Sequence, residues 1–446
     1  LYNDVASNFD CRYNYWNTVD SAAILAKISV ISGSVLWLPF RTTEIDTAIG
    51  ADTVAPTNPT GVSVTAGIGS CTVSWTAVIT DENGGALTGL NGYKVYRAQS
   101  AECRANGDTD NWEVFLIATV GSAETSYYDA APIAGIRSYY RIAAFDTHLT
   151  NGRIFTNQSW YSDSASGIPL VQAYSGPIYY VNAATGGDTV GLFNGSETYP
   201  FKTITKALSV CISGNTVSIS AGTYSETVVI DTDNITLIGV DSATTIIDPS
   251  GDSSVTTLYG IYADTQANLT IKNLRVTQCY HGIYFYNVDT SLIENVTVDY
   301  CGKNNGVGSG IFLSNGSCSN IIQNCYLFKN YYGYYFNNSN NNNILVNNKS
   351  FYNIRSGFYL TASSNNNLLI SNISNYNSAR GICLELSDYN NVTGNTCSYN
   401  AMQGFYLVTS CYNNILTNNF SSYNDSAGFY LLTSCDSNNI KNNLCY

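Results

Sequence analysis

A short apolar motif recurs along the second half of the chain at intervals of a little over twenty residues. Its copies read GIYAD, GIYFY, GIFLS, GYYFN, GFYLT, GICLE, GFYLV and GFYLL, and they begin at Gly260, Gly282, Gly310, Gly333, Gly357, Gly381, Gly404 and Gly428. The intervals between these glycines are 22, 28, 23, 24, 24, 23 and 24 residues. A period of this length, with short apolar runs and no helical spacing, predicts a β-solenoid in which each repeat forms one coil.

Polar and apolar positions alternate within each motif. The first and third residues after the glycine are apolar, as in Phe358 and Leu360. A period of two places both on one face of a strand, which we expect to be the inside of the coil. The residue between them then points outward, and Cys383 holds this position in one repeat. In the other repeats it is aromatic, and we call these residues the outward aromatic column: Tyr262, Tyr284, Phe312, Tyr335, Tyr359, Tyr406 and Tyr430.

Asparagine-rich segments separate the motifs, for example SNNNNILVNNKSFYN and CYNNILTNNFSSYN. Asparagine tolerates the left-handed backbone conformation that sharp corners require. Its carboxamide also stacks on the same group in a neighbouring strand. We therefore expect ladders of asparagine side chains at the corners of the coils.

The first half of the chain has a different pattern. The segment APTNPTGVSVTAGIGSCTVSWTAV is followed by GYKVYRAQ, WEVFLIATV and YYRIAAFDT, whose alternation and Pro-Gly turns indicate antiparallel strands. These segments resemble a fibronectin type III sandwich, which would span residues 53–170. The resemblance places Trp75 on the second strand, Tyr93 and Val95 on the third, and Tyr139 or Tyr140 near the strand of the tyrosine corner.

The segment from residue 178 resembles the start of pectate-lyase-like β-helix proteins. The residues that carry the resemblance are YPFKTI at 199–204, the short apolar helix through Leu208, GNTV at 214–217 and AGTY at 221–224. It implies a right-handed parallel β-helix over 178–446, with a cap helix near 203–211 that shields the open edge of the first coil. The predicted fold class is therefore all-β, a right-handed parallel β-helix (solenoid) plus a fibronectin type III-like β-sandwich.

The first residues, LYNDVASNFDCRYNYWNT, resemble the closing coil of such a helix. The tail stops where the next strand of the repeat is due, and Tyr2-Asn3-Asp4 repeats Tyr423-Asn424-Asp425 about one coil later. Residues 1–42 are therefore predicted to be a closing coil or cap. The residues expected at the junction of head and tail are Tyr2, Asp10, Cys11, Trp16, Cys445 and Tyr446.

Three arrangements of this head remain open. It completes the β-helix of a neighbouring subunit, which is a heterologous contact that propagates an open filament. Alternatively it folds back on its own C-terminal coil, or the chain is one period of a tandem array in a longer polypeptide. We expect the first, a structural protein that forms a head-to-tail homopolymer. The alternative function is a secreted β-helix protein that binds or cleaves polysaccharide, as a lyase or hydrolase.

The composition of the chain mainly excludes certain classes of partner. The net charge is −13, and only 11% of the residues are charged, whereas there are 53 Asn and 36 Tyr. Nucleic acid or an anionic membrane surface would need a basic patch, so neither is an expected partner. No apolar run is long enough to span a membrane. We expect an extracellular or cell-surface location, as in archaeal surface proteins, which this composition resembles, with glycans or a cell-surface polysaccharide as further partners.

The 13 cysteines are scattered and contain no Cys-x-x-Cys pair, which favours an oxidising compartment over zinc binding. Cys411 with Cys435, and Cys279 with Cys301, occupy matching repeat positions. Adjacent coils place such α-carbons near 5 Å, within the range for a disulfide. Cys71 with Cys103 is a candidate disulfide of the sandwich. Buried free thiols remain the alternative for these pairs.

The sequence contains twelve N-glycosylation sequons. About ten are expected by chance from this composition, so the number alone is no evidence of glycosylation, and their use depends on the compartment and on exposure. The candidate N-glycosylation residues are Asn157, Asn194, Asn234, Asn268, Asn295, Asn315, Asn337, Asn348, Asn372, Asn391, Asn419 and Asn424.

Candidate chemistry is sparse. Polysaccharide hydrolases need two carboxylates roughly 5 to 10 Å apart, and lyases need clustered acids for calcium together with a base. The acids of the repeats form no such cluster in the sequence, and His281 with Arg275 is the one arguable acid–base pair. We expect His281 to be a solvated corner residue, and we assign no catalytic residue, cofactor or metal. The outward aromatic column either stacks on sugars or forms a stabilising ladder.

Overall fold

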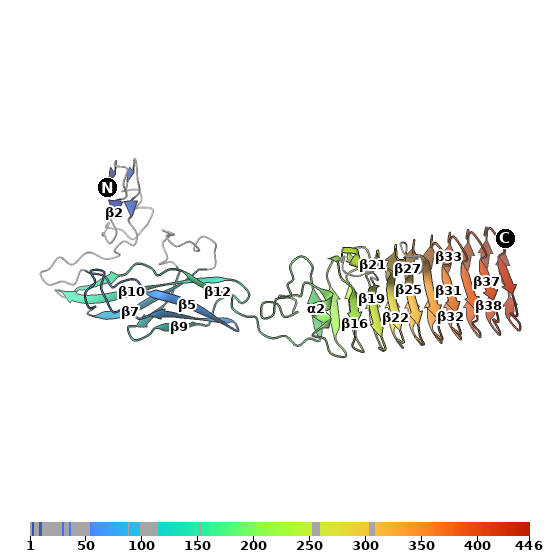
Figure 1. Ribbon diagram of the computed structural model, residues 1–446, viewed down its shortest axis with the longest axis horizontal. Coiled ribbons are helices and arrows are strands. Elements are labelled where there is room, and N and C mark those ends of the chain that lie inside the picture. Colours follow the sequence, from blue (N-terminus) through green and yellow to red (C-terminus); the bar gives the residue numbers. More distant parts are fainter. Residues whose placement is uncertain are drawn as a thin grey trace. The chain divides into compact units, whose positions relative to one another are not determined.

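A computed structural model of the 446-residue chain describes residues 54–87, 89–98, 115–150, 153–251, 259–302 and 308–446, together with four two-residue strands before residue 54. The chain divides into two compact units, Leu1–Gln172 and Ala173–Tyr446 (Figure 1). The fold class is all-β, as the sequence predicts. The domain boundaries at 53–170 and 178–446 stay predictions.

The first unit contains a sandwich of two antiparallel sheets. The three-stranded sheet has the order β5-β6-β9, and the other has the order β11-β10-β7-β8 with β12 paired to β10. The strands are β5 (Thr60–Gly67), β6 (Ser70–Thr76), β7 (Leu90–Ala98), β8 (Leu116–Gly121), β9 (Ser126–Asp129), β10 (Ser138–Thr150), β11 (Arg153–Gln158) and β12 (Ala165–Gly167).

Aromatic residues fill the core of this sandwich. Trp75 lies on β6 and its ring centroid is 5.2 Å from that of Tyr93 on β7. The Tyr93 hydroxyl accepts a hydrogen bond of 2.9 Å from the backbone N–H of Val78. Tyr140 on β10 is fully buried, and its hydroxyl donates to Asp129 at 2.8 Å. Of the two tyrosines considered for the tyrosine corner, Tyr140 is the one anchored in the core.

The head contains two parallel strand pairs. β1 (Tyr2–Asn3) pairs with β3 (Ser29–Val30), and β2 (Phe9–Asp10) pairs with β4 (Val35–Leu36). The paired residues are Tyr2 with Ser29 and Phe9 with Val35, so the partners are 27 and 26 residues apart. This offset lies within the 22 to 28 residues that separate the repeat glycines.

The second unit is a parallel β-helix whose coils stack one on the next, as Figure 1 shows. Each complete coil contributes one strand to each of three sheets, and incomplete coils at the two ends bring the sheets to eleven, ten and nine strands; we call them sheets 1, 2 and 3. Sheet 1 consists of β13 (Ile178–Val181), β14 (Thr216–Ile219), β17 (Thr236–Gly239), β20 (Thr270–Lys272), β23 (Leu292–Glu294), β26 (Ile321–Gln323), β29 (Ile344–Val346), β32 (Leu368–Ile370), β35 (Asn391–Thr393), β38 (Ile415–Thr417) and β41 (Asn439–Lys441). Sheet 2 consists of β15 (Gly222–Tyr224), β18 (Thr245–Ile247), β21 (Arg275–Thr277), β24 (Thr297–Asp299), β27 (Tyr326–Phe328), β30 (Lys349–Phe351), β33 (Ile373–Asn375), β36 (Thr396–Ser398), β39 (Phe420–Ser422) and β42 (Leu444–Cys445). Sheet 3 consists of β16 (Val228–Ile230), β19 (Tyr259–Asp264), β22 (His281–Tyr286), β25 (Ser309–Ser314), β28 (Tyr332–Asn337), β31 (Phe358–Thr361), β34 (Ile382–Glu385), β37 (Phe405–Val408) and β40 (Phe429–Leu432).

The repeat motif forms the strands of sheet 3 in the predicted orientation. Phe358 and Leu360 are fully buried inside the coil, while Tyr359 between them is on the outer face. The glycine that opens each motif is needed for space. A Cβ at Gly333 would stand 2.1 Å from Ser350 Oγ and 2.4 Å from the carbonyl oxygen of Gly357.

Three ladders of asparagines run along the corners, which confirms the expected amide stacking; all members except Asn424, Asn438 and Asn443 are buried. In each ladder the backbone N–H of one asparagine donates to Oδ1 of its equivalent in the next coil, at 2.8 to 3.1 Å. The first ladder precedes sheet 1, the second lies between sheets 1 and 2, and the third follows sheet 2. Their members are Asn320, Asn343, Asn367, Asn390, Asn414 and Asn438; Asn348, Asn372, Asn395, Asn419 and Asn443; and Asn330, Asn353, Asn377, Asn400 and Asn424.

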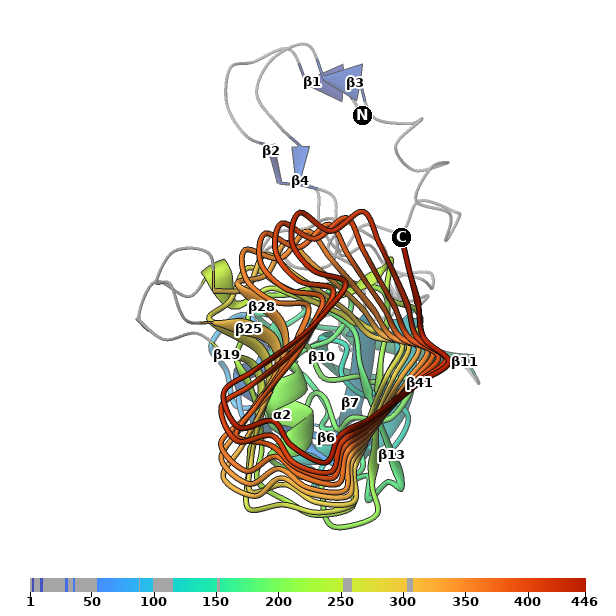
Figure 2. The same cartoon turned by 90° about the vertical axis from the view of Figure 1, so that its right-hand side faces the viewer.

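A short helix covers the first coil. Helix α2 (Ile204–Leu208) lies within the predicted cap segment 203–211 and contacts β13, β14 and β16. Its N-cap is Thr203, whose side chain accepts a hydrogen bond from the backbone N–H of Lys206. Figure 2 looks along the coils and shows α2 within their outline. Because Ile204 and Leu208 are buried, the helix shields the apolar interior at this end.

Candidate functional site

The outward aromatic column is one continuous row on sheet 3. Strand register pairs Tyr262 with Tyr284 and Tyr284 with Phe312. The row then continues through Tyr335 and Tyr359. After these residues it passes through Cys383 to Tyr406 and Tyr430.

The rings of this column stack on one another. Centroids are 4.8 Å apart for Tyr284–Phe312, 5.0 Å for Phe312–Tyr335 and 5.3 Å for Tyr335–Tyr359, and the last two rings are inclined by only 4°. Neighbouring rings therefore cover the faces on which a sugar would stack. This geometry favours the stabilising ladder over sugar binding for these four residues.

The stacking of aromatic rings along this row is interrupted at Cys383, and charged residues lie close by. Cys383 lies in the outward row, as the alternation predicts, but it is covered and only 1% exposed. The guanidinium carbon of Arg380 lies 4.4 Å from the ring centroid of Tyr406, and Tyr406 is also buried. The Tyr359 hydroxyl donates to the carboxylate of Glu385. Burial and this hydrogen bond raise the pKa of Tyr359, so the hydroxyl stays protonated and is no general base.

A second row of stacked tyrosines lies just after sheet 2, and sequence reasoning missed it. Tyr352, Tyr376, Tyr399 and Tyr423 have positive φ angles of 55 to 57° and exposed side chains. Their ring centroids are 5.2, 4.9 and 5.1 Å apart. Each is followed by a member of the third asparagine ladder, so the recurrent Tyr-Asn dipeptide is the signal that marks this row.

His281 is not the solvated corner residue that the sequence suggests. It is 5% exposed, and its ring stacks on Phe312 with centroids 4.5 Å apart. Its Nδ1 lies 2.9 Å from Ser309 Oγ. Burial lowers the pKa of His281 to about 3, so the imidazole is neutral at physiological pH.

Charged residues in the coils around His281 form ion pairs. Arg275 donates to both carboxylate oxygens of Asp299, at 2.9 and 2.6 Å, and Asp299 is fully buried. Lys272 Nζ lies 2.8 Å from Glu294, and this contact lowers the pKa of Glu294. Among the described residues, no group of three or more His, Cys, Asp or Glu is placed to hold a metal ion. These pairs stabilise the coils and are poor candidates for acid–base catalysis.

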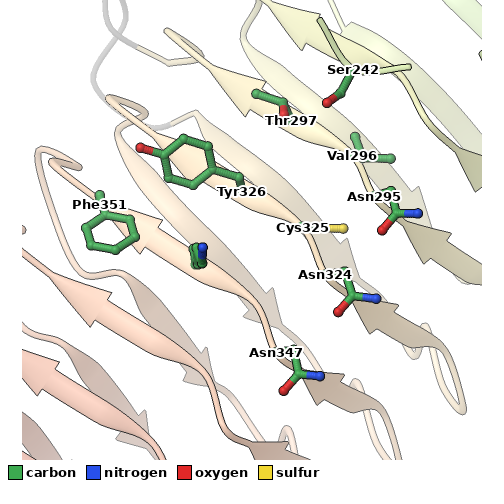
Figure 3. Close-up of a pocket in the computed structure, with 10 residues that line it drawn as sticks. Ser242, Asn295, Val296, Thr297, Asn324, Cys325, Tyr326, Asn347 and Phe351 are labelled. Carbon is green, nitrogen blue, oxygen red and sulfur yellow. The ribbon is translucent and has the colours of Figure 1, made fainter. Parts of the chain in front are cut away.

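A surface pocket of about 800 Å³ lies over the corner between sheets 1 and 2. Figure 3 shows three carboxamides along it, from Asn295, Asn324 and Asn347 in successive coils, with the rings of Tyr326 and Phe351 opposite them. The remaining lining residues are Ser242, Val296, Thr297, Cys325 and Lys349. Amide, hydroxyl, ammonium and aromatic groups together suit a ligand rich in hydroxyl groups.

Two of the predicted cysteine pairs are brought together. Cys279 and Cys301 follow β21 and β24 in equivalent positions, and their Sγ atoms lie 2.9 Å apart in a buried site. They occupy the row that continues as the third asparagine ladder, since the Cys301 N–H donates to Asn330 Oδ1. Cys411 is buried beside Cys435, and burial raises its pKa to about 11, with a further contribution from the Cys435 thiol.

We expect Cys279 and Cys301 to form a disulfide when the folded chain is incubated with oxidised glutathione. Thiol–disulfide exchange would join their sulfurs and reduce the glutathione disulfide to two glutathione thiols. Closing this loop should raise the free energy of unfolding by about 3 kcal/mol. Peptide mapping without reduction checks the bond, and reduction should lower the midpoint of thermal unfolding.

Variants provide the controls for the disulfide. Cys279→Ser should abolish both the cross-linked peptide and the effect of reduction. Cys397→Ser removes another buried thiol and should preserve both. Free Cys279 and Cys301 thiols in the oxidised native protein would contradict the prediction.

Other predicted cysteines are only partly covered by the structure. Cys71 is buried in the sandwich near Tyr140 and Asp129, and burial raises its pKa. Its candidate partner Cys103 lies outside the described residues. Cys445 is exposed on β42, and the junction residues Cys11 and Trp16 lie outside the described residues.

The last described coil, β40–β42, leaves part of its interior uncovered. Phe429 and Leu431 are partly exposed, and Ile440 is 41% exposed. Their equivalents one coil earlier are Phe405, Leu407 and Leu416, which are at most 2% exposed. Asn438 and Asn443 accept hydrogen bonds from the preceding coil as every other ladder member does. This coil therefore has the side chains and register on which a further coil would stack.

Comparison with known proteins found one matching family model and several similar solved structures. A family model described as "Periplasmic copper-binding protein (NosD)" matches residues 301–445, and no curated protein matches the chain significantly. A mutant of the periplasmic alginate epimerase AlgG is 15% identical, with 52% of this chain and 61% of that chain covered and a TM-score of 0.43. A pectate lyase is 16% identical, with 61% and 80% covered and a TM-score of 0.42. An Fn3-like protein from Clostridium thermocellum is 23% identical, with 26% and 98% covered and a TM-score of 0.17.

Fold and ladders together define the class. The chain is a parallel β-helix protein that also carries a fibronectin type III-like sandwich. It is similar to the pectate-lyase-like β-helix proteins, as the sequence motifs indicate, and residues 301–445 are similar to the NosD family. It spans 61% of the length of the alginate epimerase structure.

Proposed function

We propose that the protein is a structural β-helix of the cell exterior that assembles head to tail. In this arrangement residues 1–42 of one copy continue the coil stack of the next copy beyond β40–β42. The partner of each chain is then a second copy of itself, and the contact is heterologous, so it propagates a filament. The observation that carries the proposal is the parallel pairing within the head, whose offsets of 27 and 26 residues match about one coil of the repeat.

Burial of the exposed apolar side chains supplies the driving force. Phe429, Leu431 and Ile440 would be covered by one further coil, as Phe405, Leu407 and Leu416 are covered now. Burying a side chain of this size contributes about 1.5 to 3 kcal/mol relative to exposure. The edge strands β40, β41 and β42 would also gain backbone pairing, as in other cases of strand donation.

The head has the backbone pairing that this role requires. β1 with β3, and β2 with β4, pair in parallel with an offset of 27 and 26 residues, which is about one coil of the repeat. Parallel pairing across one coil is the pattern of a β-helix rather than of a hairpin. This pairing supports the proposal that the head stacks on the last coil of another copy.

An extracytoplasmic location fits the proposed role. The matching family is described as periplasmic, and the charge of −13 with few basic residues is suited to neither nucleic acid nor anionic lipid. In the described part of the chain, no helix has the length and apolar character needed to cross a membrane. The periplasmic description of the matching family supports a location outside the cytoplasm, at the cell surface or in the periplasm.

Electron microscopy of the purified chain tests head-to-tail assembly. The intact protein should form filaments, and a variant lacking residues 1–42 should form single particles. Ile440→Asp should also prevent assembly, because it places a carboxylate in the surface that the next coil must bury. Asn439→Asp, on the outer face of the same strand, is the matched control and should still assemble. Filaments that persist without residues 1–42 would refute donation of the head.

Polysaccharide binding is the competing function, and the pocket at Asn295 and Tyr326 is the observation that favours it. The nearby carboxylate of Glu294 is paired with Lys272, so the site suits binding better than cleavage. Compact single particles from the intact chain would favour this function. The next measurement would then be retardation of the protein in gels that contain neutral or acidic polysaccharides.

A further inference from the structure

The sequons fall into structurally different classes. Three of their asparagines, Asn348, Asn372 and Asn419, are members of the second ladder and at most 1% exposed. Others lie on the surface, including Asn234, Asn268 and Asn295, which are exposed at corners with φ of 54 to 58°. The remaining sequon asparagines are Asn157, which is buried against Asp146, and Asn194, Asn315, Asn337, Asn391 and Asn424, which are partly exposed.

A fully buried ladder asparagine cannot carry a sugar in the folded protein. Asn372 Nδ2 donates one hydrogen to the carbonyl oxygen of Leu345 at 2.9 Å and the other to Asn395 Oδ1 at 3.0 Å. Asn419 does the same with Val392 and Asn443. A glycosyl bond would replace one of these hydrogens, and the sugar would have to fit inside a closed corner. These sequons are therefore structural asparagines.

Asn295 has the opposite environment. It turns the corner between β23 and β24, its side chain is exposed, and its Nδ2 makes one hydrogen bond of 3.2 Å, to Asn273 Oδ1. The sequon hydroxyl of Thr297 is on β24, only partly covered. Both residues line the pocket of about 800 Å³ at this corner, as Figure 3 shows.

We propose that Asn295 is an N-glycosylation site and that the first sugar of its glycan lies in this pocket. In the transfer step Asn295 Nδ2 attacks the anomeric carbon of a polyprenyl-diphosphate-linked oligosaccharide. A carbon–nitrogen bond forms, the bond from that carbon to the diphosphate oxygen breaks, and the polyprenyl diphosphate leaves. The amide nitrogen gives up one proton to the transferase.

The pocket supplies the contacts that a sugar attached at this point would need. Thr297 and Tyr326 are paired residues in the adjacent strands β24 and β27, so Tyr326 lies directly beside the sequon threonine. This ring is 38% exposed and packs edge-on against Phe351, at 5.7 Å between centroids. The carboxamides of Asn324 and Asn347 follow along the same corner and can donate to or accept from sugar hydroxyls.

Glycopeptide mapping of the intact chain, secreted from a eukaryotic host that performs N-glycosylation, tests the site. We expect Asn295 to be occupied, and Asn348, Asn372 and Asn419 to be unmodified in the folded product. Thr297→Val should abolish the glycan while leaving Asn295 in place, whereas Thr297→Ser should retain it. An unmodified Asn295, or a glycan on a ladder asparagine of the folded protein, would overturn the assignment.

Enzymatic release of the glycan from the native protein tests whether the first sugar lies in the pocket. An endoglycosidase should release the Asn295 glycan from the native protein several-fold more slowly than it releases the same glycan after denaturation. Where Asn234 is also occupied, the native Asn295 glycan should likewise be released several-fold more slowly than the glycan at exposed Asn234. Tyr326→Ala should leave occupancy unchanged and raise the native release rate toward the denatured rate. Equal native and denatured release rates at Asn295 in the unsubstituted protein would refute the pocket as the seat of the sugar.

Discussion

Replacement of Asn372 by aspartate is expected to lower the free energy of unfolding of the β-helix by about 3 to 5 kcal/mol. In the native chain, Asn372 Oδ1 accepts a hydrogen bond from the backbone N–H of Asn348 at 2.9 Å, and its Nδ2 donates to Leu345 and Asn395. A carboxylate retains the acceptor but turns the donor into an oxygen that faces two other oxygens. The variant therefore contains a buried charge with two repulsive contacts.

This destabilisation should depend on pH with a defined sign. Burial among oxygens raises the pKa of the new carboxyl group in the folded state above its unfolded value. Because a protonated carboxyl group donates a hydrogen bond again, the variant should regain stability as the pH falls through that raised pKa. The difference from the native protein should then be largest at neutral pH and smaller under mildly acidic conditions.

Asn347→Asp is the matched control, because Asn347 is exposed one residue before the ladder member Asn348 and has a φ of 55° that aspartate tolerates. Its effect should stay within about 0.5 kcal/mol. Chemical denaturation followed by circular dichroism measures both variants. Equal effects at Asn372 and Asn347 would show that the ladder contributes no more than an ordinary surface asparagine.

Gly333→Ala is expected to lower the free energy of unfolding by about 1 to 3 kcal/mol through overpacking. The added methyl group would stand 2.1 Å from Ser350 Oγ and 2.4 Å from the Gly357 carbonyl oxygen. Ser350 cannot turn away at no cost, since its hydroxyl donates to that same carbonyl at 2.9 Å. The Gly357 carbonyl is also fixed in place, because it shares a peptide group with the N–H of Phe358, which donates to the carbonyl oxygen of Gly381 in the next coil.

A glycine elsewhere in the chain provides the comparison for this steric effect. At Gly121, the last residue of β8, a Cβ would meet no atom within 4 Å. Gly121→Ala should leave the stability unchanged or raise it slightly, because alanine restricts the unfolded chain. Differential scanning calorimetry compares the two variants. A Gly333→Ala protein that unfolds at the native temperature would show that the coils can separate to admit a methyl group.

The alternation of inward and outward residues could be predicted from the sequence because every coil must bury apolar side chains at the same positions of its strands. Phe358 and Leu360 had to be inside if Tyr359 was outside, and the structure has this arrangement. The asparagine ladders and the position of helix α2 followed from the same repeat and from the polar corners it needs. These features depend on local sequence and on contacts one coil away.

Features that depend on a particular neighbouring coil were missed. The burial of His281 comes from Ser309 and Phe312, which follow an interval of 28 residues where the repeat is longest. Tyrosine is an unusual residue at a positive φ, so propensity gave no reason to place Tyr376 at a corner. The pocket joins Ser242 to residues about a hundred positions later, and only the coil geometry brings them together.

The asparagines show why sequence motifs alone could not sort the sequons. Asn347 and Asn348 are adjacent, yet the first is exposed and the second is fully buried. The difference is set by one residue of register at the corner. A sequon records the local triplet, whereas exposure depends on where the coil turns.

The small height of each coil has a mechanical consequence. Strands in adjacent coils are spaced by about 4.8 Å, so a coil adds only that length to the stack. The 24 residues of a typical repeat span about 80 Å when fully extended. A pulling force that detaches one coil would therefore release a length of chain more than ten times the height of that coil. The coils beneath would keep their hydrogen bonds. Such a stack would yield in discrete steps and dissipate load instead of breaking at once.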